Sequence, residues 1–318
     1  NLDCFKILAP AWGANPGIWI EGENGKLAYG SVQPEMKEAL QAYAQWYKEG
    51  IIDPEFTTKD LEKMLQGEIS SSVGVSPYYQ YWGYDPGPNV VQNLGADAIF
   101  EPYEIPSANG GEVKASVTFA NYGYIVVSKG CKNPEAVLKL LNFYAHVMDE
   151  GDEEDADFIN ELFGNAYTNI PYALRVINPN TDYNQFVKVS GALEKGLDED
   201  PAALGKDGVK YSNSVDFIKE GASTGVGDYL QQGGPKAAYR ISKEIIDNEQ
   251  YIKDAMWGPA TETLLSAGST LDDILTEGFT KIIVGEESID YFDTLVDNWA
   301  KAGGTKATEE INETYGNN

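Results

Sequence analysis

The chain has 318 residues, of which 42% are hydrophobic and 23% are charged. These fractions are typical of globular proteins, and a chain of this length buries a substantial core, so a wholly disordered protein is excluded. The 50 acidic residues outnumber the 23 basic ones and give a net charge of −27, which repels phosphate backbones and anionic lipid. We therefore expect no nucleic-acid partner and no polybasic membrane contact.

The first residues predict a buried strand over 5–11 (FKILAPA). Because this core segment follows so closely on Asn1, which is not an initiator residue, we interpret the chain as a mature or cleaved fragment. Cys4 and Cys131 lie far apart and fit neither a disulfide framework nor a metal knuckle. Two free thiols are expected, with a single bridge between them as the alternative.

A helix is predicted over residues 31–50. Pro34 suits the first helical position, and Gly50 ends the pattern. Between them, apolar residues recur at helical spacing: Met36, Leu40, Tyr43 and Tyr47. A second helix is expected over residues 58–66, followed by a short strand over 69–75.

Residues 76–84 (SPYYQYWGY) crowd five aromatic side chains into one segment: Tyr78, Tyr79, Tyr81, Trp82 and Tyr84. Flanking glycines and prolines predict a loop. Aromatic faces stack on the C–H face of a sugar ring, while amides and carboxylates bind its hydroxyls. The segment therefore indicates a carbohydrate surface, although such a loop also suits a peptide or a partner protein.

A strand is predicted over residues 95–105, and a strand pair or one long bent strand over 115–128, on either side of a polar hairpin tip at 107–112. Asn133 and Pro134 open a further helix as cap and first residue. Strands that alternate with helices indicate an α/β fold.

The pattern then weakens and recovers. Residues 149–157 hold seven acidic residues and predict a solvated acidic loop or helix start, with a calcium site as the minor alternative. Residues 182–234 have no clear period and are interpreted as an insertion or mobile region. Helices resume from residue 236 and are clearest at the end of the sequence: 270–285, with a capping box at Thr270 and Asp273 and a stop at Gly285, then 288–303 and 305–315.

No catalytic constellation is evident. The single histidine, His146, is predicted to end a helix, where a cation interacts favourably with the helix dipole. Neither a nucleophile-elbow nor a phosphate-loop motif is present, and no carboxylate pair is marked by its setting. We expect no enzyme activity, metal or cofactor, with a glycoside hydrolase or one of its carbohydrate-binding domains as the alternative.

Three stretches carry a family resemblance: residues 25–56, which end in D-P-E-F, residues 120–144, with S-K-G-C-K-N-P-E-A-V, and residues 271–315, with F-T-K-I-I-V-G, Y-F-D and N-E-T-Y. They resemble the extracellular solute-binding proteins of ABC transporters, the group that includes maltose-binding protein, and most of all its long lipoprotein branch in Gram-positive bacteria. Members of that branch carry a sizeable N-terminal portion with a lipobox cysteine, so the resemblance implies an incomplete first lobe here.

The resemblance implies an α/β fold of the periplasmic-binding-protein-like type II, with two lobes that are joined by hinge crossings and close over ligand. Residues 1–114 and 245–318 would form the second, C-terminal lobe, and residues 115–185 would form part of the first. Residues 186–244 would be an insertion or mobile connecting region.

The resemblance also implies a site and a function. Stacking rings of sugar-binding relatives match Trp12, Tyr78, Tyr79, Trp82 and Trp257, and Asn121 and Tyr122 would face the cleft from the other lobe. The chain would be the substrate-binding component of an ABC importer, a monomer that delivers an oligosaccharide to the permease subunits. It would act outside the cell, at the cell surface or in the periplasm, and meet the membrane only through an absent N-terminal lipid anchor. A peptide or another polar solute is the alternative ligand.

Overall fold

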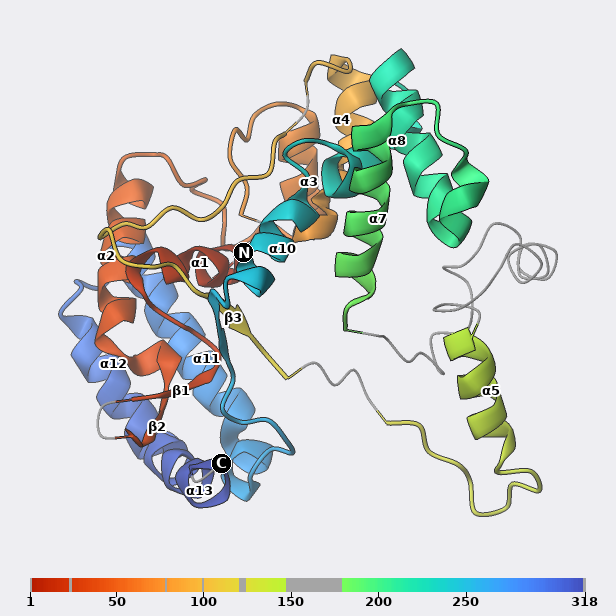
Figure 1. Cartoon of the computed structure of the whole chain (residues 1–318). Helices are drawn as coiled ribbons and strands as arrows, with labels where there is room; N and C mark the ends of the chain where they lie inside the picture. The colour runs from red at the N-terminus through yellow and green to blue at the C-terminus, as the bar shows by residue number, and fades with distance from the viewer. Residues whose placement is uncertain are drawn as a thin grey trace. The chain divides into compact units, whose positions relative to one another are not determined.

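The computed structural model describes residues 2–22, 25–77, 79–98, 100–119, 124–146 and 179–316. The chain divides into two compact units (Figure 1). Unit 1 comprises residues 1–78, 104–120 and 244–318, and unit 2 comprises residues 79–103 and 121–243.

Unit 1 is mainly helical. Its helices are α1 (Leu2–Leu8), α2 (Pro34–Lys48), α3 (Leu61–Ile69), α11 (Glu262–Val284), α12 (Tyr291–Trp299) and α13 (Thr305–Tyr315). Its strands form two small sheets. β1 (Trp19–Glu21) pairs antiparallel with β2 (Leu27–Tyr29), and β3 (Ala115–Val117) pairs parallel with β4 (Tyr251–Lys253).

The prediction of an opening strand is wrong. Residues 5–11 belong to α1 and to a 3₁₀ helix, Ala9–Trp12, in which Pro10 occupies one of the first two positions. A short apolar run fits a buried strand or a buried helix equally well, and packing decides between them. Here the Phe5 ring packs against the rings of Tyr43 and Phe56, with centroid distances of 4.9 and 5.1 Å.

Helix α2 confirms the sequence pattern. Pro34 takes its first turn, and Met36, Leu40 and Tyr43 are buried. Gly50 adopts a left-handed φ of +75°, a conformation that favours glycine.

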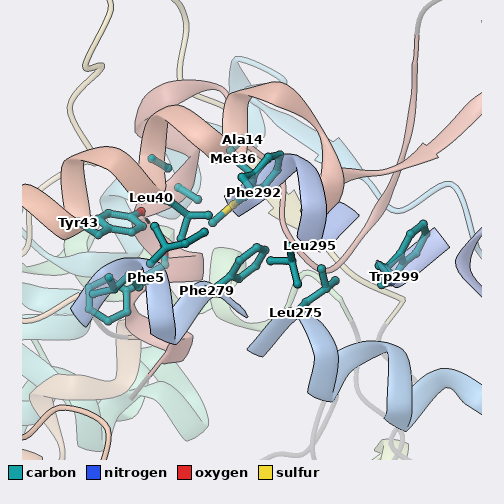
Figure 2. Close-up of a cluster of buried hydrophobic side chains, with 14 of the residues drawn as sticks. Phe5, Ala14, Met36, Leu40, Tyr43, Leu275, Phe279, Phe292, Leu295 and Trp299 are labelled. Atoms are coloured by element: carbon teal, nitrogen blue, oxygen red, sulfur yellow. Dashed lines mark hydrogen bonds between the residues drawn. The ribbon is translucent and has the colours of Figure 1, made fainter. Parts of the chain in front are cut away.

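The core of unit 1 forms where α2 packs against α11. Figure 2 shows side chains of α1, α2, α11 and α12 in this cluster: Phe5, Leu40, Tyr43, Phe279 and Leu295. Tyr43 donates its hydroxyl proton to the Phe5 carbonyl at 2.8 Å. A Cβ at Gly278 would lie 2.4 Å from the end of the Leu295 side chain, so a larger residue there would displace Leu295.

Helix α11 begins at Glu262, well before the predicted start at Thr270. Its first turn is capped from another helix, because the Glu310 carboxylate on α13 accepts the Thr263 N–H at 2.9 Å and the Thr263 hydroxyl at 2.6 Å. The predicted capping box at Thr270 and Asp273 is wrong, because both residues lie inside α11. The local sequence contains no signal for a cap that comes from another helix. Gly285, with φ +79°, ends the helix as predicted.

The C-terminal helix also contacts the antiparallel hairpin. The Asn312 side chain on α13 donates to the Leu27 carbonyl and accepts from the Leu27 N–H, both at 2.8 Å. This bidentate contact pairs the exposed edge of β2 as a neighbouring strand would. It therefore joins a residue near the start of the sequence to one near its end.

Of the strand pair or long bent strand predicted over 115–128, the described residues form a strand only at β3, and the described parts of 69–75 and 95–105 contain no strand. After α3 the chain turns instead, with the Ser72 N–H donating to the Gly67 carbonyl at 2.9 Å. Strand propensity alone does not supply the pairing partner that a strand requires.

Unit 2 is helical throughout most of its described residues. Its helices are α4 (Gly87–Leu94), α5 (Ala136–Ala145), α7 (Thr181–Lys195), α8 (Gly208–Glu220) and α9 (Val226–Asp228); α10 (Ala238–Asp247) follows. Helices α8 and α9, and all but the first residue of α7, lie within 182–234, where the sequence shows no clear period. Helix α8 explains why, since its buried face includes Gly208 and Ser214, which do not count as apolar positions.

Candidate functional site

An exposed aromatic pair follows the two parallel strands of unit 1. Phe119 comes shortly after β3 and Trp257 shortly after β4, and their rings meet edge to face with centroids 5.1 Å apart. Trp257 is 50% exposed and Phe119 is 39% exposed. The carboxyl ends of parallel strands are where open α/β sheets bind ligands. We refer to Phe119 and Trp257 as the strand-end pair.

A buried carboxylate holds the strand-end pair in place. Asp254 directly follows β4, and its Oδ1 accepts the backbone N–H groups of Trp19 and Met256, each at 3.0 Å. Its own N–H donates to the Val117 carbonyl at 2.8 Å. Burial raises the pKa of Asp254, while the two N–H donors oppose that rise. The residue ties β1 and β3 to the turn that carries Trp257.

A shallow groove begins just beyond Trp257 in the sequence. It has a volume of about 310 Å³ and is lined by residues 259–262, Glu310 and residues 313–315. The Tyr315 hydroxyl donates to the Pro259 carbonyl at 2.6 Å and fixes one wall. Carboxylates of Glu262, Glu310 and Glu313 make this groove acidic.

Trp12, a predicted stacking residue, lies half-buried in unit 1. Its ring meets Tyr43 at 5.4 Å and Trp46 at 5.7 Å, both edge to face. The residue therefore packs at the boundary of the hydrophobic core, and these contacts occupy much of its ring.

In unit 2 the predicted aromatic loop forms a tight turn. The Trp82 N–H donates to the Tyr79 carbonyl and the Asp85 N–H to the Trp82 carbonyl, both at 3.1 Å. Trp82 is half-buried, packs against a cluster that includes Phe217 and lies 4.8 Å from the Phe100 ring. Tyr79 and Tyr84, by contrast, are 51% and 40% exposed. The turn thus directs Trp82 inward and two tyrosines outward.

A polar network beneath this turn fixes Tyr84. Its hydroxyl donates to Oδ1 of the buried Asp228. Lys210 Nζ donates to the Tyr84 oxygen at 2.7 Å and to Asp228 Oδ1 at 3.2 Å, and Asn213 donates to Asp228 Oδ2 at 2.7 Å. Burial, and then the neighbouring Asp228 charge, raises the pKa of Tyr84, which stays a neutral donor. We call Tyr84, Lys210, Asn213 and Asp228 the loop-anchor network.

Two glycines permit this close packing. A Cβ at Gly227 would lie 2.3 Å from Tyr84 Cδ1, so the tyrosine ring lies directly on the Gly227 backbone. A Cβ at Gly83 would lie 3.0 Å from the Gly227 carbonyl oxygen. Sequence reasoning missed Gly227, Asp228 and Lys210, for which the only signal is the Gly-, Asp- and Lys-rich composition of 182–234.

The remaining predicted residues are placed as follows. Tyr78, Asn121 and Tyr122 lie outside the described residues, as does the acidic run 149–157. His146 directly follows α5, as predicted for a helix-end residue. Cys4 is half-buried and Cys131 exposed, and both are free thiols.

Within the described ranges, no three His, Cys, Asp or Glu side chains are arranged to hold a metal ion. None of the helices described is both long and apolar enough to cross a bilayer.

The fold of this chain is shared with a protein of known structure. The structure is similar to the crystal structure of alginate-binding protein AlgQ2 without calcium ion, with a TM-score of 0.57 and 14% sequence identity, over 98% of this chain and 62% of that one. The sequence is 24% identical to lipoprotein LipO of Bacillus subtilis (strain 168) over 353 aligned positions, which cover 98% of this chain and 60% of LipO. No family model matches the sequence.

These similarities confirm two predictions made from the sequence: the likeness to extracellular solute-binding proteins and the α/β fold class of that group. The chain spans about 60% of the length of LipO and 62% of that of AlgQ2.

Proposed function

We propose that the chain is the substrate-binding component of an ABC importer, which captures an oligosaccharide and delivers it to the membrane permease. The observation that carries this proposal is the exposed strand-end pair at the carboxyl ends of β3 and β4, in a protein with the solute-binding fold. The similarity to an alginate-binding protein supports a carbohydrate ligand, and the similarity to a lipoprotein supports a location at the cell surface or in the periplasm.

The charge of the chain favours a neutral oligosaccharide. Alginate is an acidic polysaccharide, whereas this chain carries a net charge of −27. The groove beyond Trp257 is acidic, and the ammonium of Lys210 is paired with Asp228. A polyanion would be repelled at the acidic groove and would find no net positive charge at Lys210, while a neutral sugar would meet no such repulsion.

The proposal assigns stacking to Trp257 and Tyr79, the two most exposed of the predicted site residues that the structure describes. Trp82 and Trp12 would contribute from positions that also pack in their own units. Tyr78, Asn121 and Tyr122 keep their proposed ligand contacts. Residues 1–114 and 245–318 are proposed as the second lobe, 115–185 as part of the first and 186–244 as a connecting region.

The proposed protein is a monomer without catalytic activity or a cofactor, and its partners are the oligosaccharide and the permease subunits. Similarity to a protein named as a binding protein supports the ligand-binding part of this proposal.

Isothermal titration calorimetry tests the proposal. The ligands are maltotriose, cellotriose, xylotriose, mannotriose, an alginate trisaccharide and a tripeptide. We expect saturable binding of a neutral trisaccharide, weakened at least about fivefold by Trp257→Ala because one stacking ring is worth about 1 kcal/mol beyond its buried area. Tyr103→Ala, at another exposed aromatic residue, is the matched control and should bind like wild type.

If the protein binds only the tripeptide, its ligand is a peptide and not an oligosaccharide. Release of monosaccharides during incubation would identify a glycoside hydrolase and contradict the transport role.

A further inference from the structure

The loop-anchor network of unit 2 lies at the surface and has unused hydrogen-bonding capacity. The Lys210 side chain is 28% exposed, and Tyr84 is 40% exposed. In the part of the chain that the structure describes, Lys210 Nζ has two acceptors, the Tyr84 oxygen and Asp228 Oδ1, for its three protons. One ammonium proton is therefore available to a ligand.

The geometry around Tyr84 leaves ring surface for a ligand as well. One face of the ring lies on the Gly227 backbone, and the Lys210 nitrogen lies 5.1 Å from the ring centroid. The side chain is held at its hydroxyl by Asp228, which is itself held by Asn213. An exposed ring that is fixed at its far end loses little side-chain entropy when a ligand packs on it.

A cation next to an aromatic ring suits a hydroxylated ring compound. The ammonium donates to a hydroxyl oxygen, and the aromatic surface contacts the C–H groups beside it. Because Asp228 already balances the charge of Lys210, the site offers a hydrogen-bond donor without a net positive charge. A neutral sugar meets these conditions better than a carboxylate ligand.

We propose that Lys210 and Tyr84 form a sugar subsite in unit 2, in which Lys210 donates to a hydroxyl of a neutral sugar ring and Tyr84 packs on that ring. This subsite rests on the proposed function and adds a specificity-determining polar contact to it. Asp228 and Asn213 are its positioning residues.

The test compares Lys210→Met with Lys219→Met. Both lysines lie on α8 and each pairs with an aspartate, Lys219 with Asp198 at 2.9 Å. Calorimetry uses the neutral trisaccharide panel named above. We expect Lys210→Met to weaken binding of the trisaccharide that wild type binds by about tenfold, the usual loss for a hydrogen bond from a charged donor, and Lys219→Met to leave it within about twofold.

Lys210→Met leaves Asp228 without its cation and can destabilise the fold. The double variant Lys210→Met/Asp228→Asn removes both charges and serves as the second test, with circular dichroism to show that it is folded. It too should bind at least about tenfold more weakly than wild type.

The outcomes separate the two proposals. If wild type binds a trisaccharide and both Lys210 variants bind it equally well, the subsite is wrong and the proposed function stands. If wild type binds none of the neutral trisaccharides, the proposed function fails and the subsite fails with it.

Discussion

The two aromatic surfaces are supported by buried aspartates of different kinds. Asp254 of unit 1 is bound by two backbone N–H groups, one in β1 and one in the turn after β4. Asp228 of unit 2 is bound by three side chains, those of Tyr84, Lys210 and Asn213. The two backbone N–H groups need only a hydrogen-bond acceptor at Asp254. Asp228 must also balance the positive charge of Lys210. The support in unit 2 should therefore be the more sensitive to substitution.

The largest effect is expected for Asp228→Ala. The substitution removes the partner of Lys210 and the acceptor of Asn213 and Tyr84, so the free energy of unfolding should fall by about 3 kcal/mol. Urea denaturation measures it. Asp198→Ala, which breaks the exposed pair with Lys219, is the control and should cost at most about 0.5 kcal/mol. Equal losses in the two variants would contradict the importance of the network.

Gly227→Ala should have the next largest effect. Its Cβ would overlap the Tyr84 ring, so the turn must shift, at a cost of about 2 kcal/mol. Gly191→Ala on α7 is the matched control, because nothing lies within 4 Å of its Cβ and alanine favours the helix by about 0.5 to 1 kcal/mol. Thermal denaturation should show shifts of opposite sign, and a shift of the same sign would refute the close contact.

Asp254→Asn should cost at most about 1 kcal/mol at neutral pH, since the amide oxygen still accepts both N–H groups. The clearer readout is pH dependence. A carboxyl whose pKa is raised by folding destabilises the native state once it is ionised, so its contribution to stability falls as the pH rises from 3.8 through the raised pKa. Urea titrations across this range should show that the asparagine variant lacks this decline.

Glu310→Gln should have the smallest effect on stability, and its pH dependence should be opposite to that of Asp254→Asn. The Thr263 hydroxyl and N–H lower the pKa of Glu310 to about 2, from 4.5. This carboxylate therefore stabilises the native state above pH 4.5 and loses that contribution as the pH falls toward about 2. Glu310→Gln should flatten that part of the acid-unfolding curve, and an unchanged curve would contradict the cap on α11.

The sequence predicts the helices of unit 1 best where local signals agree with tertiary packing. Pro34, the apolar stripe from Met36 to Tyr43 and Gly50 mark α2 correctly, and Gly285 marks the end of α11. The start of α11 is missed because its cap, Glu310, comes from another helix. Helix α8 is missed because Gly208 and Ser214 occupy buried positions.

The candidate site is only partly predictable for a similar reason. Aromatic crowding identifies the turn that holds Tyr79, Trp82 and Tyr84. Which rings face solvent depends on contacts with α8 and α9, which follow more than a hundred residues later in the sequence. No local pattern links Tyr84 to Lys210 or Asp228, so the support of the turn emerges only from the structure.

The contact between Asn312 and Leu27 has a consequence for biosynthesis. Unit 1 draws its core from both ends of the sequence, with Phe5 and Leu40 packed in the same cluster as Phe279 and Ile311. The N-terminal segment leaves the ribosome first. Its apolar side chains therefore stay exposed until α11 to α13 have been synthesised, while the residues of unit 2 emerge. Unit 2 can therefore fold before unit 1. A chaperone would find most apolar surface on the N-terminal segment before α11 to α13 have emerged.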